Sequence, residues 1–162
     1  MLGESKVNDD RLAVFRRRQV GLIYQFYNLI PVLNVEENIA FPVIASGGKP
    51  DFNKTYRILK RLGMGTYRYY LPNCLSGGQQ QRIAVGRALM NEPSLILADE
   101  PTGNLDSRNG KEVMDLFESL CRENGATLIV VTHDERIAAR ADRIVRIEDG
   151  RLTADEKTEK PA

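Results

Sequence analysis

The sequence lacks several features that would direct its interpretation, and each absence excludes a class of protein. Its two cysteines, Cys74 and Cys121, lack the spacing of a metal site, and the first ten residues lack the apolar stretch of a secretory leader. We therefore expect reduced thiols and a cytosolic protein. No apolar run approaches the roughly 20 residues that cross a bilayer. Any contact with a membrane is expected to pass through another subunit.

An excess of charge of one sign is also missing. The chain has 23 Lys and Arg residues against 22 Asp and Glu residues, which gives a formal net charge of +1. Binding to nucleic acid or to anionic lipid usually depends on an excess of positive charge. The one basic cluster, Arg16–Arg18 beside Arg11, is interpreted as a solvated helix face, so we expect no nucleic-acid partner.

The 162 residues also lack internal repeats, low-complexity segments and a phosphate-binding loop of the form G-x-x-x-x-G-K-[S/T]. Their length and composition, with 42% apolar and 28% charged residues, are those of a single globular domain with its own core. What the sequence does contain is a set of short motifs at the ends of predicted strands and helices.

Short apolar runs predict strands at 20–24, 94–98 and 127–132. The last two runs are continuous, which is typical of strands buried on both faces of a sheet. Helices are expected at 76–91 and 107–123. Because strands alternate with helices, the sequence indicates an α/β fold with a parallel sheet.

The stretch between the first two strands is rich in helix and loop signals. A helix that starts near Val35 should bend or end at Pro42, and a second helix should start after Asp51. We therefore expect one domain, in which residues 1–25 and 91–152 form the α/β core, 26–90 a helical subdomain and 153–162 a disordered tail.

Asp99 and Glu100 close the second predicted strand, at the carboxyl edge of the sheet, where ligands usually bind. One carboxylate there can hold Mg²⁺ through water, and its neighbour can polarise an attacking water. The plainer alternative is that two acids merely end a strand before Pro101. The four apolar residues before the pair, and the Pro-Thr-Gly-Asn-Leu-Asp run after it, favour the magnesium and water roles.

Ser76, Gly77, Gly78 and Gln79 stand at the start of a predicted helix. Glycine lets the backbone approach a ligand closely, and exposed N–H groups, the helix dipole and the serine hydroxyl favour an anion. A Ser-Gly-Gly run alone is more often a flexible loop. The Gln-Gln-Arg-Ile-Ala-Val-Gly-Arg-Ala-Leu run that follows makes an anion site the better interpretation.

His133 and Gln25 also follow predicted strands. A lone histidine is more often a packing or surface residue than a functional one. His133, however, directly follows a strand parallel to the one that ends in the two acids, which places it at the same edge of the sheet. We expect His133 to sense the γ-phosphate of a nucleotide, and Gln25 to contact Mg²⁺ or water.

These residues, in this order, resemble the nucleotide-binding subunits of ABC transporters, from about residue 10 to residue 152. Gln25 matches the Q-loop, Leu75–Gln79 the signature segment, Leu95–Asp99 the Walker B strand, Glu100 the catalytic glutamate, Asn104-Leu105-Asp106 the D-loop and His133 the switch histidine. The runs 21–29 and 98–106 look like the subgroup that serves lipoprotein release, macrolide export and antimicrobial-peptide resistance.

The resemblance implies a truncated P-loop NTPase fold that uses ATP and Mg²⁺, the metal being held by Gln25 and Asp99. Two such domains, identical or different, would close head to tail over two ATP molecules. The signature segment of one would clamp the γ-phosphate held by the other, and Glu100 would activate water. Phe26–Pro31 and the helix from Val35 would meet transmembrane subunits at the inner face of the cell membrane.

The missing phosphate loop sets the expectations for function. The first hypothesis is an ATP-hydrolysing exporter subunit that moves an amphipathic substrate and is inactive alone, since most of its affinity for ATP should be lost. Apolar surface and strand edges should then be exposed. The alternative is a non-catalytic partner that supplies its signature segment in trans to a full-length ABC ATPase. DNA-repair ATPases share the motifs, but no heptads or cysteine pairs lie between Gln25 and Ser76.

Overall fold

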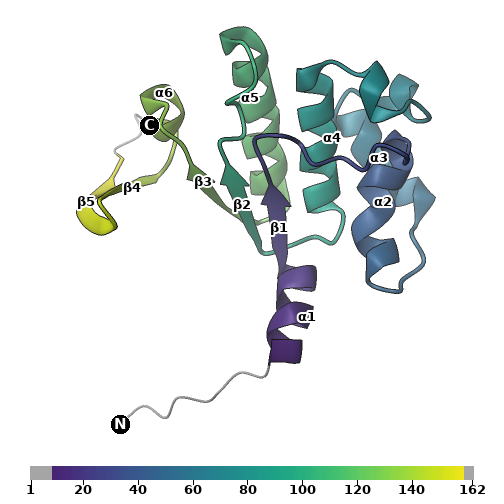
Figure 1. Cartoon of the computed structure of the whole chain (residues 1–162), viewed down its shortest axis with the longest axis horizontal. Helices are drawn as coiled ribbons and strands as arrows, with labels where there is room; N and C mark the ends of the chain where they lie inside the picture. Colours follow the sequence, from purple (N-terminus) through teal and green to yellow (C-terminus); the bar gives the residue numbers. More distant parts are fainter. Residues whose placement is uncertain (1–8, 159–162) are drawn as a thin grey trace.

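The computed structural model describes residues 9–158, in which three parallel strands form the central sheet (Figure 1). The strands are β1 (Val20–Ile23), β2 (Leu95–Asp99) and β3 (Thr127–Val131), in the order β1-β2-β3. The middle strand pairs Leu95 with Val20 on one side and with Thr127 on the other. The predicted α/β fold with a parallel sheet is therefore confirmed.

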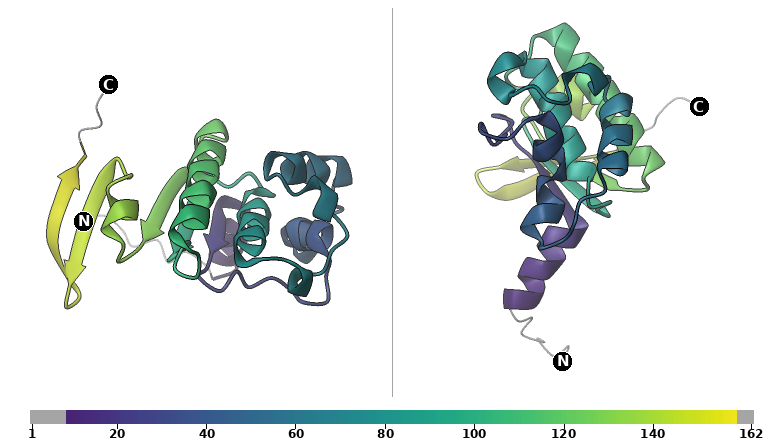
Figure 2. Two further views of the ribbon diagram at one scale, coloured as in Figure 1. Left: turned by 90° about the horizontal axis from the view of Figure 1, so that it is seen from above. Right: turned by 90° about the vertical axis from the view of Figure 1, so that its right-hand side faces the viewer.

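Two long helices cover one face of this sheet (Figure 2). They are α4 (Gly77–Leu89) and α5 (Ser107–Glu123), and they lie against each other and against the strands. Ile23, Ile96 and Phe117 are fully buried between the two layers. At Gly21, a Cβ atom would lie 2.8 Å from the Ala88 carbonyl oxygen, so this glycine allows β1 and α4 to approach closely.

The other face of the sheet is open in the described part of the chain. Leu22 exposes 44% of its surface, Leu97 37%, Ile129 48% and Val131 62%. The prediction that the strands at 94–98 and 127–132 are buried on both faces is therefore wrong for the described residues. Successive side chains of a strand point to opposite faces, and helices cover only one of those faces here.

The helical part contains α2 (Val35–Ala45), α3 (Phe52–Arg61) and two short 3₁₀ turns, Gly65–Tyr67 and Pro72–Cys74. Asn34 and Glu37 form a capping box that starts α2, and Asp51 caps α3. Of the two expectations at Pro42, the end of the helix is wrong, because α2 continues to Ala45. The packing of α2 on α4 outweighs the loss of one backbone hydrogen bond at the proline.

Beyond β3, a short helix α6 (Glu135–Ala138) leads to a hairpin of β4 (Arg143–Glu148) and β5 (Arg151–Lys157). The expected disordered tail at 153–162 is wrong for residues 153–157, which belong to β5, while 159–162 lie outside the described residues. Two exposed ion pairs accompany this polar hairpin: Arg143 to Asp155 at 2.6 Å and Arg146 to Glu135 at 2.9 Å.

At the other end of the described chain, α1 (Asp9–Gln19) leads directly into β1 and projects away from the body of the molecule (Figures 1 and 2). Residues 1–8 of the predicted core lie outside the described residues. In the described part of the chain, none of the helices combines the length and the apolar character that spanning a bilayer requires.

Candidate functional site

The three parallel strands end at one edge of the sheet, and the predicted site residues follow each of them. Gln25 lies two residues beyond β1, Asp99 and Glu100 stand at the end of β2, and His133 lies two residues beyond β3. Because the carboxyl ends of parallel strands meet at one edge, residues far apart in the sequence become neighbours. The helices α4 and α5 begin at the same edge (Figure 1).

Glu100 and His133 are in direct contact. The carboxylate of Glu100 lies 2.6 Å from His133 Nδ1 and accepts a hydrogen bond of 2.8 Å from the His133 backbone N–H. The hydroxyl of Thr132 donates to the same carboxylate at 3.1 Å. Glu100 itself has a left-handed backbone, with φ of 43°, and its N–H donates to Val131. The end of β3 thus fixes the orientation of the carboxylate that follows β2.

The strained backbone at Glu100 is a feature of the site. A left-handed conformation is unusual for a residue with a long side chain and is maintained only where the surroundings hold it. Here the contacts from Val131, Thr132 and His133 supply that restraint. A carboxylate oriented in advance, with a largely exposed histidine beside it, suits a group that has to position a water molecule.

Asp99 is exposed on the open face of the sheet, beside Leu97 and a hollow of about 150 Å³. Gln25 is placed differently, because a Cβ atom on Gly103 would lie 2.8 Å from its side-chain nitrogen. No hydrogen bond joins Gln25 to Asp99 in the part of the chain that the structure describes. The structure therefore brings these two predicted magnesium ligands to one edge without joining them.

Their chemistry nevertheless fits Mg²⁺. Among the described residues, no three His, Cys, Asp or Glu side chains form a cluster that could hold a metal ion alone. Mg²⁺ commonly takes one or two carboxylates and completes its shell with water and substrate phosphates. Asp99 supplies an accessible carboxylate and Gln25 an amide oxygen, so both suit a magnesium ion that arrives with a nucleotide.

The signature segment forms the start of α4. Ser76 is the N-cap: its Oγ accepts from the Gln79 N–H at 3.3 Å, and Gln79 Oε1 accepts from the Ser76 N–H at 2.9 Å. This capping box occupies the Gln79 side chain. The amides of Gly77 and Gly78 lie in the first helical turn, where N–H groups have no partner inside the helix. Those amides and the Ser76 O–H are available to an anion.

The D-loop residues lie between these groups. The Asn104 side chain donates to the Gln25 carbonyl at 2.8 Å. Leu105 packs near Gly77, where a Cβ atom would lie 3.4 Å from its methyl group. Asp106 caps α5, and the hydrogen bonds from Asn109 and Arg108 lower the pKa of its carboxyl. The segment after β2 therefore contacts both the segment after β1 and the signature segment.

Sequence reasoning missed three residues that join these parts. Thr132 supports Glu100, and Arg87 and Tyr27 connect the segment after β1 to α4. Thr132 was placed inside the predicted strand, although its position directly before His133 was a usable signal. Arg87 belongs to the run that follows the signature segment, but its contact with the segment after β1 joins elements that lie far apart in the sequence and has no local signal.

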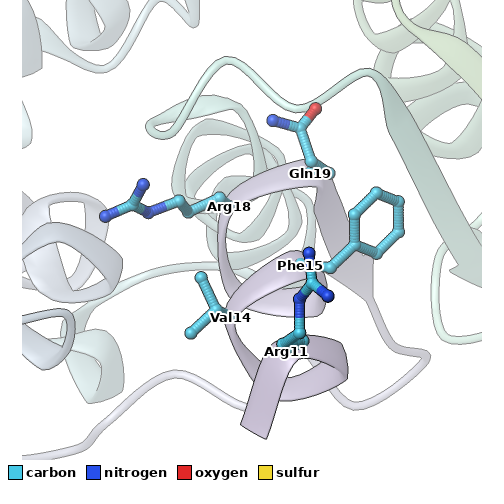
Figure 3. A pocket seen from close by; sticks show the side chains of 5 residues that line it. All are labelled: Arg11, Val14, Phe15, Arg18 and Gln19. Atoms are coloured by element: carbon cyan, nitrogen blue, oxygen red, sulfur yellow. The ribbon is translucent and has the colours of Figure 1, made fainter. Parts of the chain in front are cut away.

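A larger hollow lies along α1, with Arg11, Val14, Phe15, Arg18 and Gln19 around it (Figure 3). All five residues belong to the one helix, and Figure 3 shows Val14 and Phe15 leaving that helix on different sides. This surface lies away from the carboxyl edge of the sheet (Figure 1).

Comparison with known proteins agrees with this arrangement. The family described as ABC transporter matches residues 2–103. The chain is 46% identical over 157 residues to the macrolide export ATP-binding/permease protein MacB of Photorhabdus laumondii, covering 96% of this chain and 24% of that protein. An uncharacterised ABC transporter ATP-binding protein of Thermotoga maritima is 46% identical over 155 residues, covering 94% of this chain and 66% of that protein.

Solved structures give the same result. The ATP-binding cassette MJ0796, described as a dimer in a post-hydrolysis state bound to ADP and Pi, superposes with a TM-score of 0.82 and is 39% identical. That match covers 96% of this chain and 69% of the solved chain. A second dimeric structure of MJ0796 gives a TM-score of 0.81 at 40% identity. The chain thus spans about two-thirds of these cassettes and about a quarter of MacB.

Proposed function

The chain belongs to the family of ABC transporter ATP-binding domains, and on that basis we propose that it is an ATP-hydrolysing subunit of an exporter. Its relatives are longer, and the 162 residues contain no phosphate loop. The proposed activity therefore requires a phosphate loop supplied from outside them. In this proposal the exported substrate is amphipathic; the MacB relatives are named as macrolide export proteins.

The observation that carries the proposal is the contact between Glu100 and His133 at the carboxyl edge of the sheet. Glu100 is held by donors from the end of β3 and would orient the water that attacks the γ-phosphate. His133, with its exposed ring, would contact that phosphate. When bound, Mg²⁺ would neutralise phosphate charge beside Asp99 and Gln25.

The signature segment would serve a second ATP molecule, held by another ABC domain. The free amides of Gly77 and Gly78 and the Ser76 hydroxyl would bind the γ-phosphate there. Gln79, which completes the capping box, would keep the helix start in shape. Asn104, Leu105 and Asp106 would lie at the same interface, because they contact Gln25, Gly77 and the start of α5.

Association with a membrane would come through transmembrane subunits on the cytoplasmic side. Phe26 and Val32 are strongly exposed apolar side chains in the segment between β1 and α2. Single exposed apolar side chains are common, and it is their gathering in one stretch that can mark an interaction surface. They support the proposal that Phe26–Pro31 and the start of α2 meet those subunits.

The test is a fusion protein in which the N-terminal, phosphate-loop part of a full-length ABC ATPase precedes the whole of this chain. We term it the fused chain. The proposal expects Mg²⁺-dependent ATP turnover by the fused chain and none by the chain alone. If the fused chain folds and binds ATP without hydrolysing it, the proposal is wrong.

The alternative function, a non-catalytic partner, is favoured by one observation: the capping box at the start of α4 is complete, and Ser76 is exposed there. Its test is sedimentation of the chain with the MJ0796 cassette, with and without ATP. ATP-dependent association that Gly78→Asp abolishes would support the alternative, because a carboxylate there repels phosphate. Without such association the alternative fails.

A further inference from the structure

The segment after β1 has an unusual backbone for its residue types. Tyr27 has φ of 58° and Asn28 has φ of 47°, so two consecutive residues adopt the left-handed conformation. Asparagine tolerates this region, but a bulky aromatic residue adopts it at a cost and only where its surroundings hold it. Local hydrogen bonds supply part of the restraint, since the Tyr27 N–H donates to the Tyr24 carbonyl at 3.2 Å and the Asn28 N–H to the Phe26 carbonyl at 2.5 Å. Contacts with α4 supply the rest.

Arg87, in the last turn of α4, supplies one restraint. Its guanidinium donates to the Asn28 carbonyl at 2.5 Å and to the Tyr27 carbonyl at 2.8 Å. The guanidinium is half-buried, and loss of solvent lowers its pKa from the ordinary value. Hydrogen bonds from a charged donor are stronger than neutral ones, and these two act on the carbonyls of both left-handed residues.

Tyr27 supplies a second contact at the other end of the same helix. A Cβ atom on Gly77 would lie 2.6 Å from the Tyr27 hydroxyl and 3.6 Å from the ring carbon that carries it. Burial of this hydroxyl raises the pKa of Tyr27. The phenol therefore lies against the first residue of α4, beside Ser76 and the free amides.

We infer that Arg87 and Tyr27 are positioning residues that fasten the segment after Gln25 to both ends of α4, so that this segment and the signature segment move together. The role of these contacts in transport rests on the proposed function, whereas the contacts themselves do not. In the proposed transporter, a displacement of Phe26–Pro31 by a membrane subunit would reach Ser76 and Gly77 within the same chain. Neither residue touches nucleotide in this account, and both act through the groups they hold.

The test is hydrogen exchange of the chain in the absence of nucleotide, so its outcome does not depend on ATP binding. Arg87→Met removes the donors and keeps an apolar chain of similar length. We expect exchange to rise about tenfold or more at the hydrogen-bonded amides within these segments, Tyr27 and Asn28 in 26–30 and Gln79 and Gln80 in 76–80. A lost charged hydrogen bond lowers the free energy of local opening. Unchanged exchange at 76–80 would overturn the inference.

The matched control is Arg82→Met, which removes an arginine of the same helix that donates to the Leu62 carbonyl and pairs with Glu112. It should leave exchange at 26–30 and 76–80 as in the unmodified chain. If Arg82→Met changes both segments as Arg87→Met does, the effect is a general loosening of α4 and the inference is wrong.

A second test keeps the inference open to refutation if Arg87→Met does not fold. Gly77→Ala should raise exchange at 26–30, because the added methyl group displaces the Tyr27 hydroxyl. Adding Tyr27→Phe should restore slow exchange, since the remaining ring carbon lies at an ordinary contact distance of 3.6 Å. Failure of Tyr27→Phe to restore it would contradict the contact. Failure of the fused chain to hydrolyse ATP would instead count against the proposed function alone.

Discussion

The two faces of the central sheet carry the same kind of residue and differ in what covers them. Ile23 and Ile96 are 1% and 0% exposed beneath α4 and α5, whereas their sequence neighbours Leu22 and Leu97 expose 44% and 37%. A continuous apolar run predicts cover on both faces. The apolar sequence of these strands is suited to burial on both faces of the sheet. The described residues cover only one face, with α4 and α5, and leave the other exposed.

The open face has a second exposed feature beside it. In the described part of the chain, β3 pairs with β2 alone, and the β4–β5 hairpin forms a separate sheet. An unpaired strand edge next to apolar side chains favours association with other chains. This arrangement agrees with the proposal that further residues of an ABC domain are needed to complete the site.

The largest expected effect compares neighbouring residues of β2. Ile96→Ala should lower the free energy of unfolding by about 3 kcal/mol, because it empties space in a packed core. Leu97→Ala should cost less than about 1 kcal/mol, because its side chain already faces solvent. Urea unfolding of both variants measures the difference. Equal losses would mean that the open face is covered in solution, for instance by self-association.

A charged residue placed on the open face of the sheet tests whether the phosphate-loop part covers that face. In the chain alone, Ile129→Lys should change the free energy of unfolding by no more than about 0.5 kcal/mol, since residue 129 is exposed. In the fused chain it should cost about 2 kcal/mol or more, because a charge would be buried. Chemical denaturation of both forms measures this.

Val32→Lys is the matched control for that experiment, because Val32 is apolar, 82% exposed and lies in the segment before α2. It should have little effect in either form. An equal, small effect of Ile129→Lys in both forms would show that the phosphate-loop part does not cover this face.

The smallest expected effect lies outside both faces, at Asp134. Pairing with Arg136 and its backbone N–H lowers the pKa of this carboxyl to about 2. The ionised form caps α6, so its stabilising effect should be complete above the ordinary pKa of 3.8 and should fade as the pH falls toward 2. Titration of the carboxyl by NMR checks this. A midpoint near 3.8 would contradict the pairing.

Several parts of the site were predictable because they depend on local pattern and on sheet geometry. Glu100 and His133 follow separate apolar runs, and parallel strands bring such positions to one edge, which the 2.6 Å contact confirms. The helix start at Ser76 was predictable as well, since Ser and Gln spaced three residues apart form a capping box.

Other parts depend on contacts between distant residues and could not be read from local pattern. The helix through Pro42 persists because α2 packs on α4. The polar residues 153–157 form a strand because their backbone pairs with β4 in an antiparallel hairpin. The Gln25 side chain lies against Gly103, a contact between residues 78 positions apart that local pattern does not indicate.

The most direct test of the central claim is ATP turnover by the fused chain with Glu100→Gln. The claim is that the carboxyl edge of this sheet is the hydrolytic half of an ABC ATPase site. Glu100→Gln should lower turnover at least about 100-fold while ATP still binds, because the amide cannot accept a proton from the attacking water. Glu148→Gln, at the exposed end of β4, should leave turnover unchanged. If Glu100→Gln keeps the turnover of the parent, Glu100 is not the catalytic carboxylate and the claim fails.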